Sequence, residues 1–306
     1  MVLIAASLPG LAALAALLFT WMQVRQASKE LRISEQGQIT TRFNAAIGNL
    51  GSQSLDIRLG GIYALRRIME DSARDHPAVV SVLSAFAQEH AGLSQESFKE
   101  PLDDPFKPPV HTPKPDVRAA IDTLARRNPD RDAGAWINLG RTDLRSLVFP
   151  GKAAIRLPGV GLSEADLRDA ILTGADLRGA ILDRAHLDRA LLDKANLQGA
   201  FLGGASLVGV ALWGANLRGV DTCGVTGVTR KKCVDLHDSQ LDGADLRNTN
   251  LSYVNLQGAH LKSADLRGAD LTRANLTGAD FSDAKLAGVK LKGAKRAGAT
   301  GLPNER

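Results

Sequence analysis

The chain has 306 residues, with 38 Lys and Arg against 33 Asp and Glu, and a pI of about 9.3. This length allows two modest domains, and because only 4% of the residues are aromatic, alanine and leucine must supply most of the core. Two cysteines, Cys223 and Cys233, exclude the disulfide framework of a small secreted protein. In a cytosolic body we expect both to be reduced thiols.

Residues 1–24 contain no charged side chain and predict a transmembrane anchor. A helix over Val2–Met22 rises about 30 Å, the thickness of a bilayer core, and Trp21 stands at its end, where interfacial aromatic residues belong. Arg25, Lys29 and Arg32 follow, which predicts a single-pass protein of the cell membrane with its N-terminus outside and its body in the cytoplasm. A secretory signal peptide is disfavoured because no basic residue precedes the stretch and no small-x-small cleavage site follows it. A buried soluble helix is the third reading.

Residues 25–90 have the apolar spacing of amphipathic helices. The first expected helix carries Ile39 and Leu50, the second lies in "SLDIRLGGIYALRRIMED", and the third starts at Pro77. The pattern favours a small α-helical bundle. The alternative is a HEAT-like surface, because "IRLGGIYALRRI" loosely resembles one such repeat, of which a single copy is visible.

Six of the twelve prolines lie in residues 91–115, which predicts an extended linker. Residues 116–136 then predict a capping helix and a turn. Its apolar positions, Val117, Ala120, Ile121 and Leu124, are expected to lie against the start of the following domain.

From Leu162 to Leu217, and again from Leu236 to Leu291, every fifth residue is leucine except for Phe281, and the residue two before it is usually alanine. On an α-helix, leucines five apart would be rotated by about 140° and would make no stripe. The period fits a chain that turns every five residues, so that four sides close a coil of 20 residues. Successive coils then stack about 4.8 Å apart with leucine and alanine inside. Glycines such as Gly174 and Gly179 occupy the corners.

The motifs "ADLRG" at 175–179 and 264–268, and "ANLQG" at 195–199, resemble those of pentapeptide-repeat proteins, over residues 137–300. The resemblance implies a right-handed quadrilateral β-helix solenoid. The expected fold class is therefore mainly β, preceded by one transmembrane helix and a small α-helical region, with a short tail at 301–306. The layout is also similar to membrane-anchored bacterial members of this family.

Two stretches depart from the period. Leu139, Leu144 and Phe149 are five apart but out of register with Leu162, which predicts a degenerate first coil that ends at Pro150–Gly151. Residues 218–235 interrupt the coil and are either a distorted coil or a loop. Cys223 and Cys233 both lie there, at a spacing that matches no common zinc site.

A row of Asp and Asn, such as Asp176, Asn196 and Asp265, precedes many of the leucines. We interpret it as backbone support at the corners and not as a bank of catalytic carboxylates. The sequence contains no phosphate loop, nucleophile–base pair or metal-ligand spacing, so we expect no catalytic residue, no cofactor and no metal.

Charge over residues 160–300 is balanced, with 18 Lys and Arg against 16 Asp and Glu. Residues one coil apart pair by sign, as in Glu164 with Arg184 and Asp169 with Arg189. Some family members mimic DNA, which requires a strongly acidic surface. The balanced charge therefore disfavours DNA mimicry, and we do not expect a nucleic-acid partner.

The outward position before each leucine alternates between polar and apolar residues in the first block. This alternation places Ile171 and Leu191 on one side of the coil and Ile181 and Phe201 on the opposite side, with Trp213 near the end of the block. These five residues are the candidate interaction surface. The alternative is that they are ordinary exposed apolar residues.

The pattern predicts a non-enzymatic, membrane-tethered scaffold or protein-interaction module with an unknown protein partner or a second copy of itself. The alternative is a DNA-mimic-type regulator of a topoisomerase, or another resistance or immunity factor.

Overall fold

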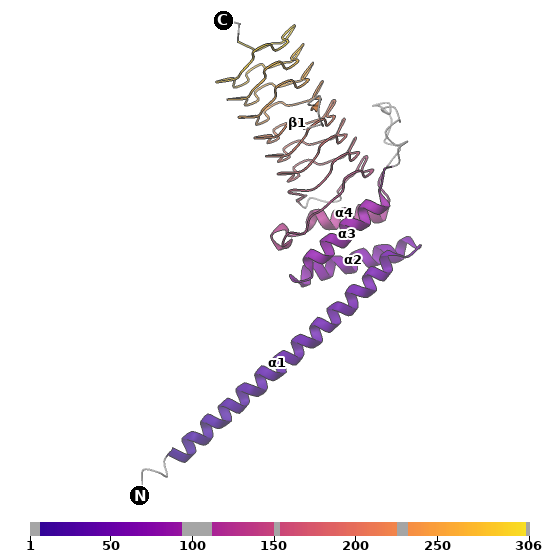
Figure 1. Ribbon diagram of the computed structural model, residues 1–306, viewed down its shortest axis with the longest axis vertical. Coiled ribbons are helices and arrows are strands. Elements are labelled where there is room, and N and C mark those ends of the chain that lie inside the picture. The colour runs from indigo at the N-terminus through magenta and orange to yellow at the C-terminus, as the bar shows by residue number, and fades with distance from the viewer. Residues whose placement is uncertain (1–6, 94–111, 150–153, 225–231, 304–306) are drawn as a thin grey trace. The chain divides into compact units, whose positions relative to one another are not determined.

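The computed structural model describes residues 7–93, 112–149, 154–224 and 232–303. Its elements are α1 (Ser7–Leu50), α2 (Leu55–Asp71), α3 (His76–His90), α4 (Pro115–Arg126), the 3-10 helix η2 (Pro129–Arg131), β1 (Cys223–Gly224) and β2 (Lys232–Cys233), most of them labelled in Figure 1. The chain divides into two compact units, Met1–Ile68 and Met69–Arg306. The division falls inside α2, and the domain boundaries predicted from the sequence remain predictions.

The first unit contains α1 and most of α2. The two helices approach closely at Gly61, because a Cβ atom there would lie 2.8 Å from the carbonyl oxygen of Ala46. The connection between the helices is held by Arg58, whose Nη1 donates to the carbonyl oxygens of Ser52 and Gln53, both at 2.9 Å. A tight helix pair therefore forms from the apolar spacing that the sequence shows.

None of the helices in the described residues combines the length with the apolar character that crossing a bilayer demands. The predicted anchor over residues 1–24 is therefore wrong, and so are the single-pass topology and the membrane location that were built on it. The helix does not end where the uncharged run ends. It passes from Ser7 through the polar Thr20 and Gln23 into Arg25 and Lys29 without a break.

The second unit contains a coil that advances 20 residues per turn, and Figure 1 shows its turns stacked on one another. Single parallel bridges join residues one turn apart, for example Ile171 to Leu191 and Asp176 to Asn196. The leucines and the alanines two residues before them point inward and are buried, as Leu177 and Ala175 illustrate. We call this structure the repeat coil.

The prediction of a mainly β fold, a right-handed β-helix, is wrong for the described residues. The only strands there are β1 and β2, two residues each and antiparallel, whereas the rest of the repeat coil consists of turns and isolated bridges. The reason is geometric. With a corner every five residues, each side of the coil has room for one bridged residue and not for a run of consecutive pairs. The longest regular elements of the described residues are the helices.

The predicted first coil is present, although Phe149 is only partly buried. Leu139 and Leu144 are buried, and the bridges from Asn138 to Gly161 and from Asp143 to Asp166 span 23 positions. Three extra residues thus explain the register shift, and the predicted end at Pro150–Gly151 lies outside the described residues.

α3 packs on α4, which carries the four predicted apolar residues, all fully buried. The carbonyl oxygen of Ala125, near the end of α4, accepts a hydrogen bond of 2.7 Å from the backbone N–H of Arg156 in the repeat coil. The helix thus lies at the N-terminal end of the coil.

Most of the predicted linker, at 94–111, lies outside the described residues. Its first residues are bonded to the first coil, because the Leu93 N–H donates to the carbonyl oxygen of Arg141 at 2.9 Å and the Asp143 N–H donates to that of Ala91 at 2.7 Å. The last residue of the predicted linker, Pro115, begins α4.

The interruption at 218–235 is an insertion. Phe201 and Asp221 are bridged one regular turn apart, but Ser206 is bridged to Asp235, 29 positions away instead of 20, so the chain between them is nine residues longer than a regular turn. The stems of this insertion are β1 and β2, and a disulfide joins Cys223 to Cys233 across them. The expectation of two reduced thiols is therefore wrong. Pairing the two stems brings the cysteines opposite each other, which their spacing alone does not reveal.

Candidate interaction surface

The bridged positions of the repeat coil form four rows, one on each side. Row A consists of Val148, Ile171, Leu191 and Ala211, and row B of Gly161, Ile181 and Phe201. From Gly161 in row B the chain passes to Asp166 in a first polar row, to Ile171 in row A, to Asp176 in a second polar row, and back to Ile181 in row B. Rows A and B therefore lie on opposite sides of the coil, which is the arrangement predicted for Ile171, Leu191, Ile181 and Phe201.

Row A is a line of half-exposed aliphatic side chains. Val148 is 42% exposed, Ile171 39% and Leu191 40%. Trp213, 53% exposed, stands two residues beyond Ala211 at the next corner. Its backbone N–H donates to the Asp193 carboxylate at 3.0 Å, and Nζ of Lys194 lies 4.8 Å from the centre of its ring. The structure thus places Trp213 with row A and holds its ring in a defined position.

Row B is one residue shorter than row A. Ile181 is half-buried and Phe201 is 45% exposed, and Asp221 follows one turn later. Rows A and B therefore share an apolar character but differ in length, and the five predicted surface residues do not form one continuous patch.

The Asp and Asn side chains of the polar rows support the corners, as predicted. Asp176, Asn196 and Asp265 each accept a hydrogen bond from the backbone N–H two residues later. The Arg267 guanidinium, bonded to Asp265, lowers the pKa of that carboxyl to about 2. Asp280, further along the side of row A, has a similar pKa of about 2, and the Ser282 hydroxyl is its main cause. These carboxylates serve the backbone and their neighbours.

Ion pairs between successive turns are also confirmed. Arg184 contacts Glu164 at 2.6 Å, and Arg189 contacts Asp169 at 2.7 Å. An exposed pair of this kind contributes little to stability, but the pairs balance the charge of the coil locally. Asp183 differs from the carboxyls whose pKa is lowered, because burial raises the pKa of Asp183.

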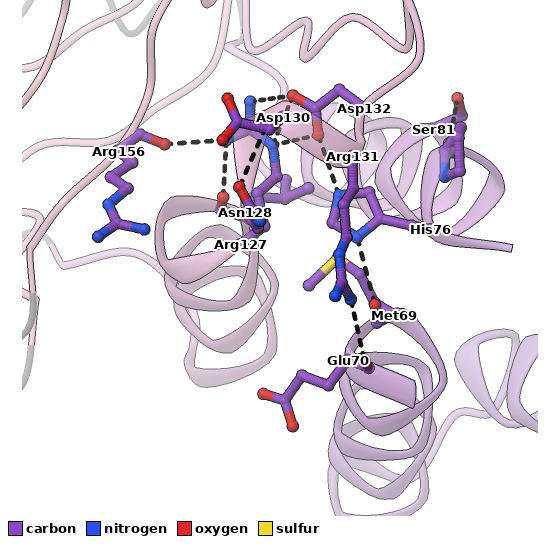
Figure 2. Close-up of polar contacts among 12 residues, drawn as sticks. Met69, Glu70, His76, Ser81, Arg127, Asn128, Asp130, Arg131, Asp132 and Arg156 are labelled. Atoms are coloured by element: carbon purple, nitrogen blue, oxygen red, sulfur yellow. Dashed lines mark hydrogen bonds and ion pairs between the residues drawn. The ribbon is translucent and has the colours of Figure 1, made fainter. Parts of the chain in front are cut away.

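A buried polar cluster joins α3, the segment after α4 and the start of the repeat coil (Figure 2). Nδ1 and Nε2 of His76 face the Met69 carbonyl oxygen at 3.2 Å and the Asp132 carboxylate at 3.0 Å. Arg127 contacts the same carboxylate at 2.6 Å and donates to the carbonyl oxygen of Arg156 at 2.8 Å. This carboxylate, cation and imidazole constellation was missed by the sequence analysis. Its polar groups contact one another and neighbouring backbone carbonyl oxygens, so the cluster has a structural role.

In the part of the chain that the structure describes, no three His, Cys, Asp or Glu side chains are grouped as a metal site would require. The absence of a cofactor and of catalysis remains a prediction.

The comparisons with known proteins agree with the repeat geometry. The sequence model of the family described as pentapeptide repeats matches residues 161–199, 185–221, 232–268 and 255–293, and thus leaves out most of the inserted segment between Cys223 and Cys233. The chain belongs to the pentapeptide-repeat family. No curated protein matched it significantly.

Three solved pentapeptide-repeat structures are 30–32% identical to the chain. Rfr23 from the cyanobacterium Cyanothece 51142 has 30% identity over 38% of this chain and 58% of its own, with a TM-score of 0.25. HetL from the cyanobacterium Nostoc has 32% identity over 53% and 81%, with a TM-score of 0.19. A thylakoid lumen protein from Arabidopsis thaliana has 30% identity over 36% and 67%, with a TM-score of 0.24. This chain covers less than two thirds of the length of Rfr23. The comparisons do not support the expectation that this chain is a membrane-anchored member of the family.

One surface residue of this pentapeptide-repeat chain was not found from its sequence. Trp136, 53% exposed, lies over Gly161 of row B, where a Cβ atom would come within 2.5 Å of the indole ring. Its Nε1 donates to the carbonyl oxygen of Gly159 at 2.9 Å. The indole extends row B towards the N-terminal end. The only signal in the sequence is the glycine at a row position where other turns carry a side chain.

Proposed function

We propose that the chain is a non-enzymatic protein-interaction module whose repeat coil presents rows A and B to a partner protein. The observation that supports this most directly is the exposure of aliphatic and aromatic side chains in lines, at Ile171 and Leu191 on one side and Phe201 on the other. Aligned apolar side chains on a rigid frame are what a protein partner can bury.

Two further features support binding over catalysis. The carboxylates of the polar rows are engaged with backbone N–H groups and arginines, as at Asp176 with Arg178. A repeat coil is also a convex rod, whereas substrate sites are concave and gather several polar groups.

Proximity labelling tests the proposal. The full chain, fused to a biotin ligase in its own cells, is compared with two double variants, Ile171→Glu with Leu191→Glu and Ile181→Glu with Phe201→Glu. All four side chains point outward, so the free energy of unfolding of each variant should stay within about 0.5 kcal/mol of the wild-type value. We expect at least one protein to lose its labelling by several fold in one of the variants. An unchanged set of labelled proteins in both variants would refute the proposal.

A further inference from the structure

We propose that row A binds an amphipathic α-helix of a partner protein, lying along the axis of the repeat coil. The inference rests on the proposed function, because it names the kind of partner that one of the two rows accepts. It concerns Val148, Ile171, Leu191 and Ala211, with Trp213 at the far end.

The backbone of row A at Leu191 and Ala211 is already engaged between the turns. The Leu191 N–H donates to the carbonyl oxygen of Ala170 at 2.9 Å, and the Leu191 carbonyl oxygen accepts from the Leu172 N–H at 2.8 Å. The Ala211 N–H likewise donates to the carbonyl oxygen of Ala190 at 3.0 Å. A partner therefore cannot add a strand to this side, since strand addition needs an edge with free donors and acceptors. It must contact side chains.

The spacing of the row suits a helix. Successive members of row A are one coil apart, about 4.8 Å, and an α-helix rises about 5.4 Å per turn. Over the three steps from Val148 to Ala211 the mismatch adds up to about 2 Å, which side-chain rotamers can absorb. A helix with one apolar residue per turn therefore keeps contact with all four members and ends near the indole of Trp213.

The charges beside the row are balanced. The corners on either side of Ile171 and Leu191 carry three acidic and three basic side chains, namely Arg168, Asp169, Asp188, Arg189, Asp193 and Lys194. Asp169 and Arg189 neutralise each other directly at 2.7 Å. Such a frame complements the mixed charges of an amphipathic helix. It does not complement a nucleic acid or an anionic membrane, which require a surplus of basic residues.

The size of the row argues against a second copy of the chain. Row A is one side chain wide and about 20 Å long over four turns. It therefore falls well short of the roughly 800 Å² per partner that a stable interface between two folded chains buries. A helix of about 13 residues covers the same length. The small contact predicts weak, reversible binding.

A designed peptide provides the test. The probe is a fluorescein-labelled, 18-residue helix with leucine at positions i, i+4, i+7 and i+11 and equal numbers of Lys and Glu elsewhere, and the full chain is titrated into it. We expect a dissociation constant of about 10–100 μM, typical of a small interface, and a shift of the tryptophan emission that is lost in the Trp213→Phe variant. Ile171→Glu with Leu191→Glu should weaken binding about tenfold or more. The matched control, Gln240→Glu with His260→Glu, adds the same charges further along the same side and should bind like the wild type.

Several results would overturn the inference: equal binding of a scrambled peptide that has no apolar stripe, equal binding by the Ile171–Leu191 variant, or binding that disappears between 50 and 200 mM salt. Sedimentation of the chain alone is a further arm, because a dimer that the same variant dissociates would assign row A to a second copy. If proximity labelling depends on row A but the helix does not bind, this inference fails while the proposed function stands.

Discussion

At each regular corner of the repeat coil one residue adopts a left-handed backbone conformation, and that position is filled either by glycine or by a residue with a side chain. Gly278 has a φ of +70°, and Ser263 occupies the equivalent position of another corner with a φ of +59°. The left-handed conformation costs an L-residue about 1–2 kcal/mol, whereas it costs glycine almost nothing. The choice of residue at each corner is therefore a direct control on stability.

Replacing Ser263 with glycine should stabilise the chain, and replacing Gly278 with alanine should destabilise it by about 1 kcal/mol. Both positions are exposed, and a Cβ atom at Gly278 would meet no other atom within 4 Å, so the backbone conformation alone decides the result. Urea unfolding of the two variants beside the wild type measures the effect. A change of the same sign in both variants would contradict the explanation.

The corner glycines were predictable because they depend on a local rule that recurs every five residues. Gly174 and Gly179 have φ values of +69° and +63°, as a tight corner requires. Trp136 was not predictable in the same way. Its position over Gly161 depends on a contact between two turns and not on the repeat.

Among the elements, the N-terminal cap of the repeat coil depends on a buried ion pair as well as on apolar packing. Arg127 is 4% exposed, and its guanidinium joins Asp132 to the carbonyl oxygens of Leu124 and Arg156 (Figure 2). A buried ion pair need not stabilise a fold, but removing one partner leaves an uncompensated charge. The cap should therefore be sensitive to the loss of Asp132.

We expect Asp132→Ala to lower the free energy of unfolding by about 3 kcal/mol, because Arg127 would remain buried without its carboxylate and His76 would lose a contact at 3.0 Å. Asp130→Ala is the matched control, since Asp130 lies in η2, two residues before Asp132, and is exposed. Thermal and urea unfolding of the full chain give the comparison. If the two alanine variants are equally stable, the ion pair has no such role.

The elements differ in how far their sequence reveals them. The repeat coil was expected in its period, its buried leucines and its corner support, because each depends on neighbours at a fixed spacing. Its class was not, since five residues per side leave single bridges where strands were expected. The disulfide was missed because an insertion pairs Cys223 with Cys233 across stems that follow no repeat. The anchor was misjudged because α1 continues beyond the uncharged run that defined it.

For the molecule as a whole, each stack of identical turns must end, and the C-terminal end of the coil shows how. Ala264, Ala269 and Ala274 are fully buried, but the equivalent Ala284, Val289 and Ala294 of the last turn are partly exposed. A partly exposed apolar end of this kind favours the stacking of another chain. The chain carries a charged residue at this end of the coil.

Arg296 occupies the inward position of the last turn where the preceding turns have Leu256 and Leu276. Its guanidinium donates to the carbonyl oxygen of Leu291 at 3.2 Å and to that of Pro303 at 3.4 Å. A polar group thus covers the apolar end and ties the following segment across it. Terminal repeats with a polar outer face keep repeat proteins soluble by the same means.

Arg296→Leu should therefore promote end-to-end association of the chain, because it restores the repeat residue, removes the two hydrogen bonds and enlarges the apolar end. We expect a sedimentation coefficient that rises with protein concentration more steeply than that of the wild type over a tenfold range. Lys295→Leu, which removes one positive charge from an outward position of the same turn, is the matched control and should sediment like the wild type. Equal association of both variants would show that charge repulsion, and not the covering of the end by Arg296, keeps the turns of different chains apart.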